Sequence, residues 1–324
     1  MRDIRSLGTL LELSYVEICV TIREANIAEI GVMTKIHSVP VPTLADYVER
    51  ADDTAPTISV VTTVRNGART LDRAIKSVRA QEIPDLEYIV VDACSTDGTH
   101  DILRTNGDIV TYWICEPDKG ISDGFNKGIA LSRGKYVQLL NADDWLSSNQ
   151  LVQGVGTLEK SGADFVFGDL IYHDRDGKPL YRVRGDANYM RCIGHIMPAL
   201  NHPTVIVRRS AYEKHGLFDL TLKLAMDYEF LLRLHRKGCR GAYDPEILGH
   251  MSLDGASDTA SRVALGEVRN VAIRYGGWAA LEWARYFFRL AKGDTRRILR
   301  NALPAPFYER LRAGLNRDYI RLTP

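Results

Sequence analysis

The chain has 324 residues, 45% hydrophobic and 26% charged, so it can bury a core large enough for a globular α/β domain with appendages. Its 42 Lys and Arg residues almost equal its 41 Asp and Glu residues, which disfavours a general nucleic-acid-binding protein with its usual basic excess. The sequence has no apolar run of the about 20 residues that span a bilayer. The five cysteines form no C-x-x-C pair, so we expect reduced, mostly buried thiols in a cytosolic protein.

Residues 1–55 precede the first convincing strand. Their apolar stretch, 10–22, is interrupted by Glu12 and Glu17 and lacks a small-residue cleavage site, so it is a poor signal peptide. We expect residues 1–55 to form a peripheral or poorly ordered extension that ends in a proline-marked linker.

Strands and helices alternate in the segment that follows. Four apolar runs predict buried strands, at 57–64, 87–91, 110–114 and 135–140. Three segments between them predict helices, at 71–78, 100–104 and 124–132. Further strands are expected at 164–172 and 204–207, and a helix at 225–234. The alternating order predicts a parallel sheet flanked by helices.

Polar side chains follow three of these strands. Asn66 follows the first, Asp92 ends the second, and residues 141–144 follow the fourth. Ligands of open α/β sheets bind beyond the carboxyl ends of the strands. These polar residues therefore predict a binding site along one rim of the sheet.

Residues 141–144 read Asn-Ala-Asp-Asp, with two carboxylates at a strand end. Such a pair suits Mg²⁺ or Mn²⁺, which completes its shell with water and substrate phosphate oxygens. The alternative is an Asx turn in which Asp143 or Asp144 caps the next helix. Asp92, with the polar residues 95–97, is open to two interpretations as well: hydrogen bonding to a base or ribose, or a helix-capping turn.

Asp227 lies between Met226 and Tyr228 at the start of a predicted helix. A carboxylate among apolar groups can have a raised pKa and act as a general base. The alternatives are an N-terminal helix residue or an ion-pair partner. His202 and His250 are expected to be structural, with His250 also considered as a completing metal ligand.

Several familiar motifs are missing. The sequence has no G-x-x-x-x-G-K-[ST] loop and no G-x-S-x-G elbow, which argues against a P-loop NTPase and an α/β-hydrolase. The run Gly154-Val155-Gly156 lacks a third glycine and a preceding strand, so we do not interpret it as a dinucleotide-binding loop.

Five segments in order carry a resemblance to a known family. They are ISVVTTVRNG, VVDACSTDGTHDIL, EPDKGISDGFNKGIALSRGKYVQLLNADD, NHPTVIVRRSAYEKHGLFD and AMDYEFLLRL. Together they resemble family 2 glycosyltransferases, and most of all bacterial enzymes that build exopolysaccharide, colanic-acid-like polymers or O-antigen. The resemblance implies a GT-A-type domain at 56–257, with a mostly parallel twisted sheet flanked by helices, and leaves a helical appendage at 258–324.

The resemblance also implies residue roles. Asp143 aligns with the metal ligand of the family's D-x-D motif, and Asp227 aligns with the general base of inverting members. The remaining matches line the nucleotide-sugar pocket: Thr63, Asn66, Asp92, Asp123, Asn126, Asn141 and Asp144. Three positions depart from the family's pattern: Asn141 replaces the first Asp of D-x-D, Arg65 replaces an aromatic residue, and Met226 replaces an acid.

The implied function is a metal-dependent, inverting, hexosyltransferase-like enzyme that uses Mn²⁺ or Mg²⁺. It would move a sugar from a nucleoside diphosphate, with UDP favoured, to a hydroxyl of a glycan or lipid-linked acceptor in cell-surface polysaccharide synthesis. Two alternatives are a sugar-1-phosphate nucleotidylyltransferase and a sugar-nucleotide-binding protein with weakened catalysis. The nucleotidylyltransferase would need a G-x-G-T-R loop, which residues 64–67 lack.

The C-terminal part is basic. From residue 271 onward it has eleven Lys or Arg and four Asp or Glu, and 11 − 4 gives +7. Arg285, Arg289 and Lys292 recur at helical spacing, with Trp283 and Phe287 on another side. This pattern predicts an interfacial helix on an anionic membrane surface, at the inner face of the cell membrane. The alternative is a helix whose aromatic side packs on the catalytic domain, with solvated arginines outside.

Overall fold

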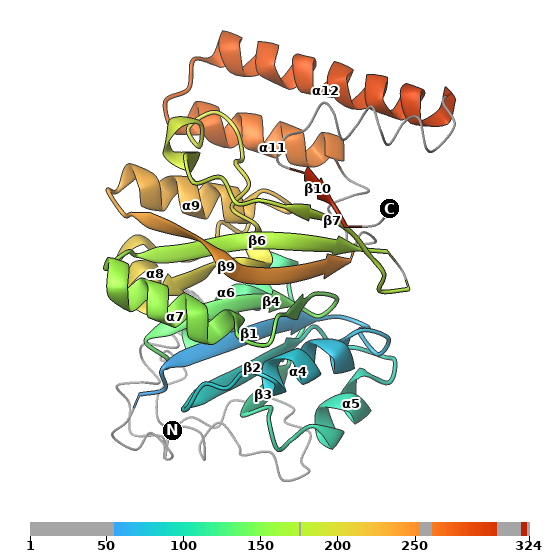
Figure 1. Ribbon diagram of the computed structural model, residues 1–324, viewed down its shortest axis with the longest axis vertical. Coiled ribbons are helices and arrows are strands. Elements are labelled where there is room, and N and C mark those ends of the chain that lie inside the picture. Colours follow the sequence, from blue (N-terminus) through green and yellow to red (C-terminus); the bar gives the residue numbers. More distant parts are fainter. Residues whose placement is uncertain (1–54, 175, 253–260, 303–318, 323–324) are drawn as a thin grey trace, which may run out of the picture.

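The structure is a computed structural model that describes residues 55–174, 176–252, 261–302 and 319–322 (Figure 1). Almost all of the predicted extension at 1–55 lies outside the described residues. Of the four cysteines in the described part, only Cys239 is buried, so the expectation of mostly buried thiols is wrong there. The four described thiols are free, and Cys94 is exposed.

Four parallel strands form one half of the sheet, in the order β3-β2-β1-β4 (Figure 1). They are β1 (Ile58–Val64), β2 (Leu86–Asp92), β3 (Tyr112–Cys115) and β4 (Tyr136–Asn141). Every side chain of β1 is buried, because helices cover both faces of a parallel sheet. The parallel sheet predicted from the alternating pattern is confirmed for these strands.

The other half of the sheet is mixed. Its main strands are β6 (Phe165–His173), β7 (Pro179–Val183), β8 (Ile206–Arg208) and β9 (Gly241–Ser252). β8 is antiparallel to both β4 and β6, whereas β9 is parallel to β6. The short strands β5 (Trp145–Leu146) and β10 (Tyr319–Arg321) add antiparallel edges to β9 and β7. β6 and β7 are antiparallel because only a short turn joins them, too short for the crossover that parallel strands need.

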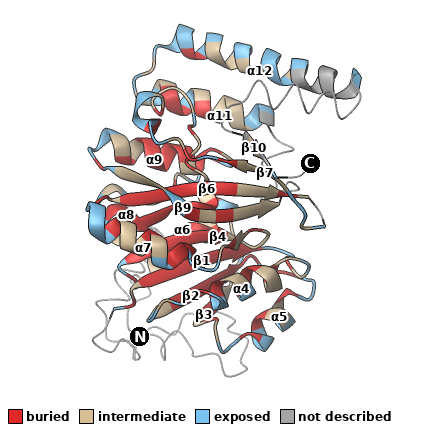
Figure 2. Cartoon of the chain, in the orientation of Figure 1, coloured by how far each residue is buried: buried red, intermediate tan, exposed pale blue. Residues whose placement is uncertain are grey.

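Two layers of helices cover the two faces of the sheet. One layer contains α4 (Leu71–Arg79), α5 (Thr99–Thr105) and α7 (Gln150–Ser161). The other contains α6 (Ile121–Leu131), α8 (Arg209–His215), α9 (Met226–Arg236) and α11 (Ser261–Arg274). Neighbouring residues of one strand serve opposite layers, as Val60 and Val61 do, because strand side chains alternate between faces. Figure 2 shows the resulting buried sheet between its helices.

The final long helix, α12 (Ala279–Ala302), lies outside this sandwich beside α11 (Figure 1). Burial along α12 is slight compared with the sheet (Figure 2). None of the described helices combines the length and apolar character needed to cross a membrane.

Two glycines let α6 lie directly on β1. A Cβ on Gly128 would fall 2.1 Å from Val61 Cγ1, and one on Gly124 would fall 2.8 Å from Thr63 Cγ2. Larger side chains at these two positions would push the helix off the strand. The close approach sets Asp123, in the first turn of α6, near the carboxyl end of β1.

Replacing Gly128 with Ala should destabilise the protein, although alanine favours helices by about 1 kcal/mol over glycine. The branched Val61 cannot move its Cγ1 without disturbing β1, and overpacking of this kind costs about 1–3 kcal/mol. The matched control is Gly156→Ala in α7, where a Cβ meets no atom within 4 Å and should stabilise by about 0.5–1 kcal/mol. Urea unfolding of the full chain measures both. Equal shifts in the two variants would contradict the packing argument.

Candidate active site

The rim predicted from the sequence forms where β2, β1 and β4 end. Val64 pairs with Asp92, and Thr63 pairs with Asn141, so the three strand ends lie side by side. A Cβ on Gly67 would lie 3.6 Å from the Cβ of Ala142, which shows that the loops after β1 and β4 touch. Parallel pairing therefore brings together residues that are 75 or more positions apart in the chain, such as Asn66 and Asn141.

The loops after β1 and β2 hold each other through hydrogen bonds. Asn66, with a left-handed φ of 54°, accepts a bond from the Thr96 amide, and its own amide donates to Ser95 Oγ. Asp97 accepts bonds from the amides of Ala68 and Thr99. Asp97 therefore forms a turn just before α5, but the residue that precedes the helix is Gly98, so no side chain of residues 95–97 is its cap. The Asn66 side-chain oxygen is engaged in the loop contact.

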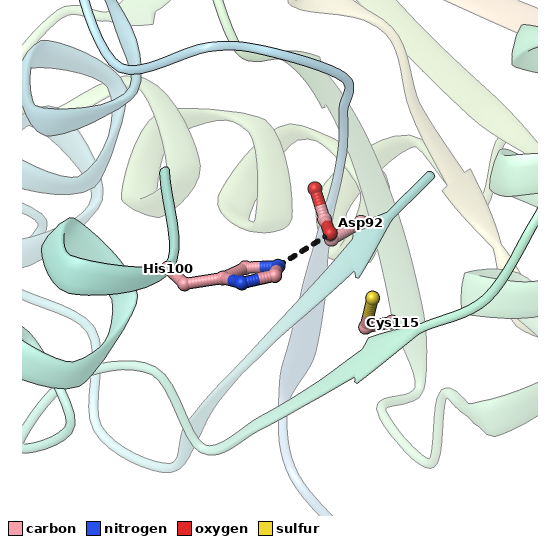
Figure 3. A group of neighbouring side chains, drawn as sticks. All are labelled: Asp92, His100 and Cys115. Atoms are coloured by element: carbon pink, nitrogen blue, oxygen red, sulfur yellow. Dashed lines mark hydrogen bonds and ion pairs between the residues drawn. The ribbon is translucent and has the colours of Figure 1, made fainter. Parts of the chain in front are cut away.

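Asp92 is fully buried at the end of β2. Its Oδ1 accepts a bond from the Ser95 hydroxyl, and its Oδ2 accepts one from the Ser95 amide at 3.0 Å. His100 Nε2 lies 2.8 Å from the same Oδ2 (Figure 3). Both oxygens of Asp92 are thus engaged within the protein, and the nucleotide contact that the resemblance implies stays a prediction.

Asp143 and Asp144 follow β4 and lie in a region of low polarity. Asp144 is 1% exposed and accepts a bond from Asn141 Nδ2 at 2.9 Å. Burial, and then the neighbouring Asp143 charge, raises the pKa of Asp144 well above its usual range. Burial likewise raises the pKa of Asp143, which stays partly accessible. Two carboxylates placed in this way favour a bound cation.

The next helix excludes one alternative. α7 begins at Gln150, and Asn149 is the residue that precedes it. The interpretation of Asp143 or Asp144 as the cap of that helix is therefore wrong, because β5 and a turn stand between them.

Arg73 of α4 lies near this pair of carboxyl groups, and its positive charge lowers the pKa of both. Burial raises the two pKa values by more than Arg73 lowers them. Its Nη2 donates to the Asp143 carbonyl at 2.9 Å, and its guanidinium lies 3.7 Å from the centre of the Trp145 ring. The arginine thereby fixes the backbone of the Asp143 loop through its carbonyl and leaves the partly exposed Asp143 carboxylate accessible to another cation.

Two buried polar atoms at this rim have no hydrogen-bond partner among the described residues: Asn141 Oδ1 and Arg73 Nε. An unpaired buried acceptor is costly, so such atoms usually await a ligand or water. Asn141 Oδ1 together with the Asp143 and Asp144 carboxylates is a set of oxygen donors that fits Mn²⁺ or Mg²⁺. The replacement of the first motif Asp by Asn141 preserves an oxygen but removes one negative charge.

His250 does not complete this set. His173 Nε2 lies 2.9 Å from His250 Nδ1, and Ser147 Oγ lies 2.9 Å from His250 Nε2, so both ring nitrogens are engaged. Burial lowers the pKa of His250 to about 4, which keeps it neutral. Its ring stacks on Trp145 at an interplanar angle of 4°, so the histidine supports the Asp143 loop from β9.

Asp227 lies in the first turn of α9 and lines a cavity of about 20 Å³, which has room for about one water molecule. His202 and Leu139 line the same cavity. Burial raises the pKa of Asp227, and the neighbouring His202 charge opposes that rise. His202 Nε2 is a third buried atom without a partner among the described residues. A water or an acceptor hydroxyl would satisfy both groups.

α6 connects the two carboxylate regions. Ser122 donates to Met226 Sδ, directly before Asp227, and Met226 is buried. The apolar replacement at Met226 is therefore part of the packing between α6 and α9. Asn126 forms two bonds with the Phe218 backbone, so it anchors the chain before α9 instead of presenting its amide to a ligand. Asp123 accepts a bond from the Lys119 amide and lies 3.7 Å from Lys127 Nζ.

Sequence reasoning did not identify Arg73, Trp145 or the His173–His250 pair. Arg73 is a polar residue on an ordinary amphipathic helix, so no local pattern marks it. Trp145 directly follows the Asp pair, and its position in the sequence could have indicated an aromatic contact next to the predicted metal site. The strand β9 that carries His250 was also missed, because Asp244, Pro245 and Glu246 interrupt its apolar pattern.

The chain is similar in sequence to known glycosyltransferases. The sequence profile of "Glycosyl transferase family 2" matches residues 59–216. The uncharacterized glycosyltransferase MT1564 of Mycobacterium tuberculosis is 33% identical over 187 residues, which cover 55% of this chain and 69% of that protein. The chain belongs to glycosyltransferase family 2. A further relative of the enzyme, the succinoglycan biosynthesis protein ExoO of Rhizobium meliloti, is 28% identical over 210 residues and 60% of each chain.

Solved structures show the same fold. TarS 1–349 of S. aureus in complex with UDP-GlcNAc superposes with a TM-score of 0.54, at 17% identity, over 70% of this chain and 69% of that chain. The mannosyltransferase PcManGT of Pyrobaculum calidifontis, in complex with GDP-Man and Mn²⁺, gives 0.56 at 18% identity over 93% and 86%. The GT-A fold predicted for the enzyme is confirmed.

The oxygen set at Asn141, Asp143 and Asp144 predicts metal-dependent stabilisation. Mn²⁺ with a nucleoside diphosphate should raise the melting temperature of the wild type, because a ligand at 100 times its Kd adds about 2.7 kcal/mol to the folded state. Asp143→Asn should lose this shift, whereas Asp176→Asn, in a surface turn, should retain it. The melting temperatures of the wild type and both variants, measured with and without EDTA, test this prediction. A shift that EDTA leaves intact would argue against a metal at this position.

Proposed function

We propose that this glycosyltransferase moves a sugar from a nucleoside-diphosphate donor to an acceptor hydroxyl by a single inverting displacement. The observation that carries the proposal is the pairing of two carboxylate regions with unsatisfied polar atoms. One is the oxygen set at the end of β4, where Asn141 Oδ1 has no partner in the part of the chain that the structure describes. The other is Asp227 beside His202 Nε2, which likewise has no partner in that part. Leu139 of β4 connects them, since it lines the Asp227 cavity and lies two residues before Asn141.

The donor is a nucleotide sugar, with UDP as the favoured carrier. TarS 1–349 and PcManGT are solved with UDP-GlcNAc and with GDP-Man, which supports this class of donor for a chain of the same fold. Thr63 and Asn66 line the nucleotide side of the rim, Asp123 the diphosphate-sugar side, and Asp92 holds the loop between them. Asp143 is the main metal ligand, with Asn141 and Asp144 as its neighbours. A bound Mn²⁺ or Mg²⁺ stabilises the charge that develops on the leaving diphosphate.

Asp227 is the general base. Its carboxylate accepts the proton of the acceptor hydroxyl while that oxygen forms its bond to the anomeric carbon and the bond to the diphosphate breaks. The first turn of α9 fixes its position, and the Tyr228 amide donates to its Oδ1 at 2.7 Å. This leaves Oδ2 for the acceptor. No covalent enzyme intermediate is required.

The acceptor is a glycan or a lipid-linked saccharide in cell-surface polysaccharide synthesis. The relative ExoO, a succinoglycan biosynthesis protein, supports this class, although the chain spans only 60% of its length. Membership of family 2 argues against a sugar-1-phosphate nucleotidylyltransferase. A sugar-nucleotide-binding protein with weakened catalysis is distinguished by donor hydrolysis: an active enzyme in Mn²⁺ releases nucleoside diphosphate from its donor, and a binding protein does not.

Asp227→Asn should leave donor binding intact and reduce turnover by about 10²–10⁴-fold, the usual contribution of general base catalysis. The matched control is Asp101→Asn, whose carboxyl is exposed on α5 and should not alter turnover. Steady-state kinetics and nucleotide titration separate the two effects. Near-normal turnover in Asp227→Asn would show that another group is the base.

As pH is lowered, turnover should begin to fall at a higher pH than it would if the base were an Asp with an ordinary pKa. The base must be ionised, and burial raises the pKa of Asp227 above its ordinary value. Turnover is therefore full above the folded-state pKa and is lost as pH falls through it. The pH dependence of turnover, with stability checked at each pH, tests this. An acidic limb at or below the ordinary Asp value of about 3.9 would contradict it.

We further propose that α12 places the enzyme on the cytosolic face of an anionic membrane, where lipid-linked acceptors lie. Its apolar side chains face outward: Phe288 is 69% exposed and Phe287 is 58% exposed, with Trp278 at 74% just before the helix. The alternative, an aromatic side packed on the catalytic domain, is met in part, since Trp283 and Tyr286 lie against Arg269 of α11. Aromatic residues beside cations suit the interface between lipid headgroups and acyl chains.

The cations of α12 are less available than the sequence suggested. Arg285 pairs with the buried Glu282, and Arg289 donates to the His195 carbonyl. Lys292 is exposed. Exposed aromatic rings, more than a row of free arginines, therefore support the membrane contact.

A variant with Phe287→Ser and Phe288→Ser should no longer float with anionic vesicles, while the wild type floats and is partly released in high salt. The control is Val152→Ser, an exposed apolar residue on α7, which should float as the wild type does. Turnover on a soluble acceptor should be unchanged in both. Equal flotation of all three proteins would show that α12 does not bind the membrane.

A further inference from the structure

A cluster of softer ligands lies beside the rim, apart from the oxygen set of β4. Asp92 ends β2, His100 lies in the first turn of α5, and Cys115 ends β3 (Figure 3). One oxygen of Asp92, one ring nitrogen of His100 and the Cys115 sulfur lie within 4.8 Å of one another. The three come from separate elements, yet the pairing of Asp92 with Cys115 and the first turn of α5 bring them together.

A fourth donor lies next to them. Cys94 Sγ is 3.5 Å from Cys115 Sγ. Cys94 is exposed and holds a left-handed backbone with a φ of 55°, two residues after Asp92. The three grouped residues therefore offer one sulfur, one nitrogen and one oxygen, and Cys94 adds a second sulfur that lies beside Cys115 but outside the 4.8 Å group.

We propose that Asp92, Cys94, His100 and Cys115 form a zinc site. Zn²⁺ favours four-coordinate sites of thiolate, imidazole and carboxylate, with ligand distances of about 2.0–2.3 Å. Tetrahedral geometry at those lengths places ligand atoms about 3.3–3.8 Å apart. The 3.5 Å between the two sulfurs already matches. Binding would require Asp92, His100 and Cys115, now within 4.8 Å of one another, to draw closer and Cys94 to turn its sulfur toward Asp92 and His100. Mn²⁺ and Mg²⁺ prefer oxygen ligands, so the two metal sites differ in the ions they select.

Zinc binding exchanges protons for the metal. The Cys115 thiol loses its proton to solvent, and the pKa of that thiol in the metal-free site is about 12, raised by burial and by the neighbouring Cys94 and Asp92. The metal would replace the contact between His100 Nε2 and Asp92 Oδ2, now 2.8 Å long. Affinity should therefore increase with pH, as is usual where ligands must be deprotonated.

The site joins β2, β3 and α5 at the loop that holds Asn66. Ser95 and Asp97 of this loop bond to the Asn66 and Ala68 amides, so a metal at Asp92 would stabilise the nucleotide side of the rim without contacting the sugar. The inference is independent of the proposed role of Asp143, because no ligand is shared.

The test uses the full chain, stripped with EDTA and kept in a phosphine reductant so that Cys94 and Cys115 stay reduced. Co²⁺ is the probe, since thiolate ligation gives a near-ultraviolet charge-transfer band and tetrahedral geometry gives strong visible bands. We expect one Co²⁺ per chain with both features, displaced by Zn²⁺, and a higher melting temperature with Zn²⁺. A wild-type protein without the charge-transfer band would overturn the proposal.

Variants identify the ligands. Cys115→Ser and His100→Gln should each weaken Zn²⁺ binding by more than the about 10–100-fold that loss of an outer-shell partner costs. Two controls should keep the full Co²⁺ spectrum: Cys192→Ser, a half-buried cysteine outside the cluster, and Asp143→Asn. Circular dichroism confirms folding, and His100→Gln remains informative if Cys115→Ser does not fold. Retention of the band in Cys115→Ser, or its loss in Asp143→Asn, would show that the metal binds elsewhere.

Discussion

The parallel register of β1 with β2 and β4 is the constraint on which the site depends. It aligns Val64 with Asp92 and Thr63 with Asn141, so the loops that follow meet at one rim. A slip of one residue would turn every side chain of a strand to the opposite layer, where the two hydrophobic cores could not accommodate them. Burial on both faces thus fixes the register, and the register fixes the site.

Stability is given up in the two regions to which we assign the chemistry. The carboxyl groups of Asp144 and Asp227 both have pKa values raised by burial, which means that their ionised forms are unfavourable in the folded protein without a ligand. Among the described residues, five buried polar side-chain atoms have no hydrogen-bond partner, and those of Asn141, Arg73 and His202 lie in these two regions. A core selected only for stability would pair or remove such groups, and their presence beside buried carboxylates is typical of a functional site.

Support for this strained region comes from the second half of the sheet. His250 on β9 bonds Ser147 and His173 and stacks on Trp145, while Arg73 covers the other approach to that ring. The loop bearing Asp143 is therefore held by side chains and backbone, leaving its carboxylate accessible. The mixed strands thus act as a support for the parallel half. Outside the sandwich, α12 exposes its aromatic residues on a surface that the catalytic core does not use.

The sequence by itself determined the parallel half of the fold and the polar residues that line its rim. Buried strands read as continuous apolar runs, and polar residues just beyond them mark the rim, because these patterns are local in the chain. It did not determine the antiparallel strands, β9 in particular, whose charged and proline residues break the pattern. Nor did the sequence predict that Arg73 packs against Trp145, that Asp92 is buried next to His100, or that Phe287 and Phe288 of α12 are exposed. Those features depend on contacts between residues far apart in the chain, and only the packed tertiary structure decides which of them form.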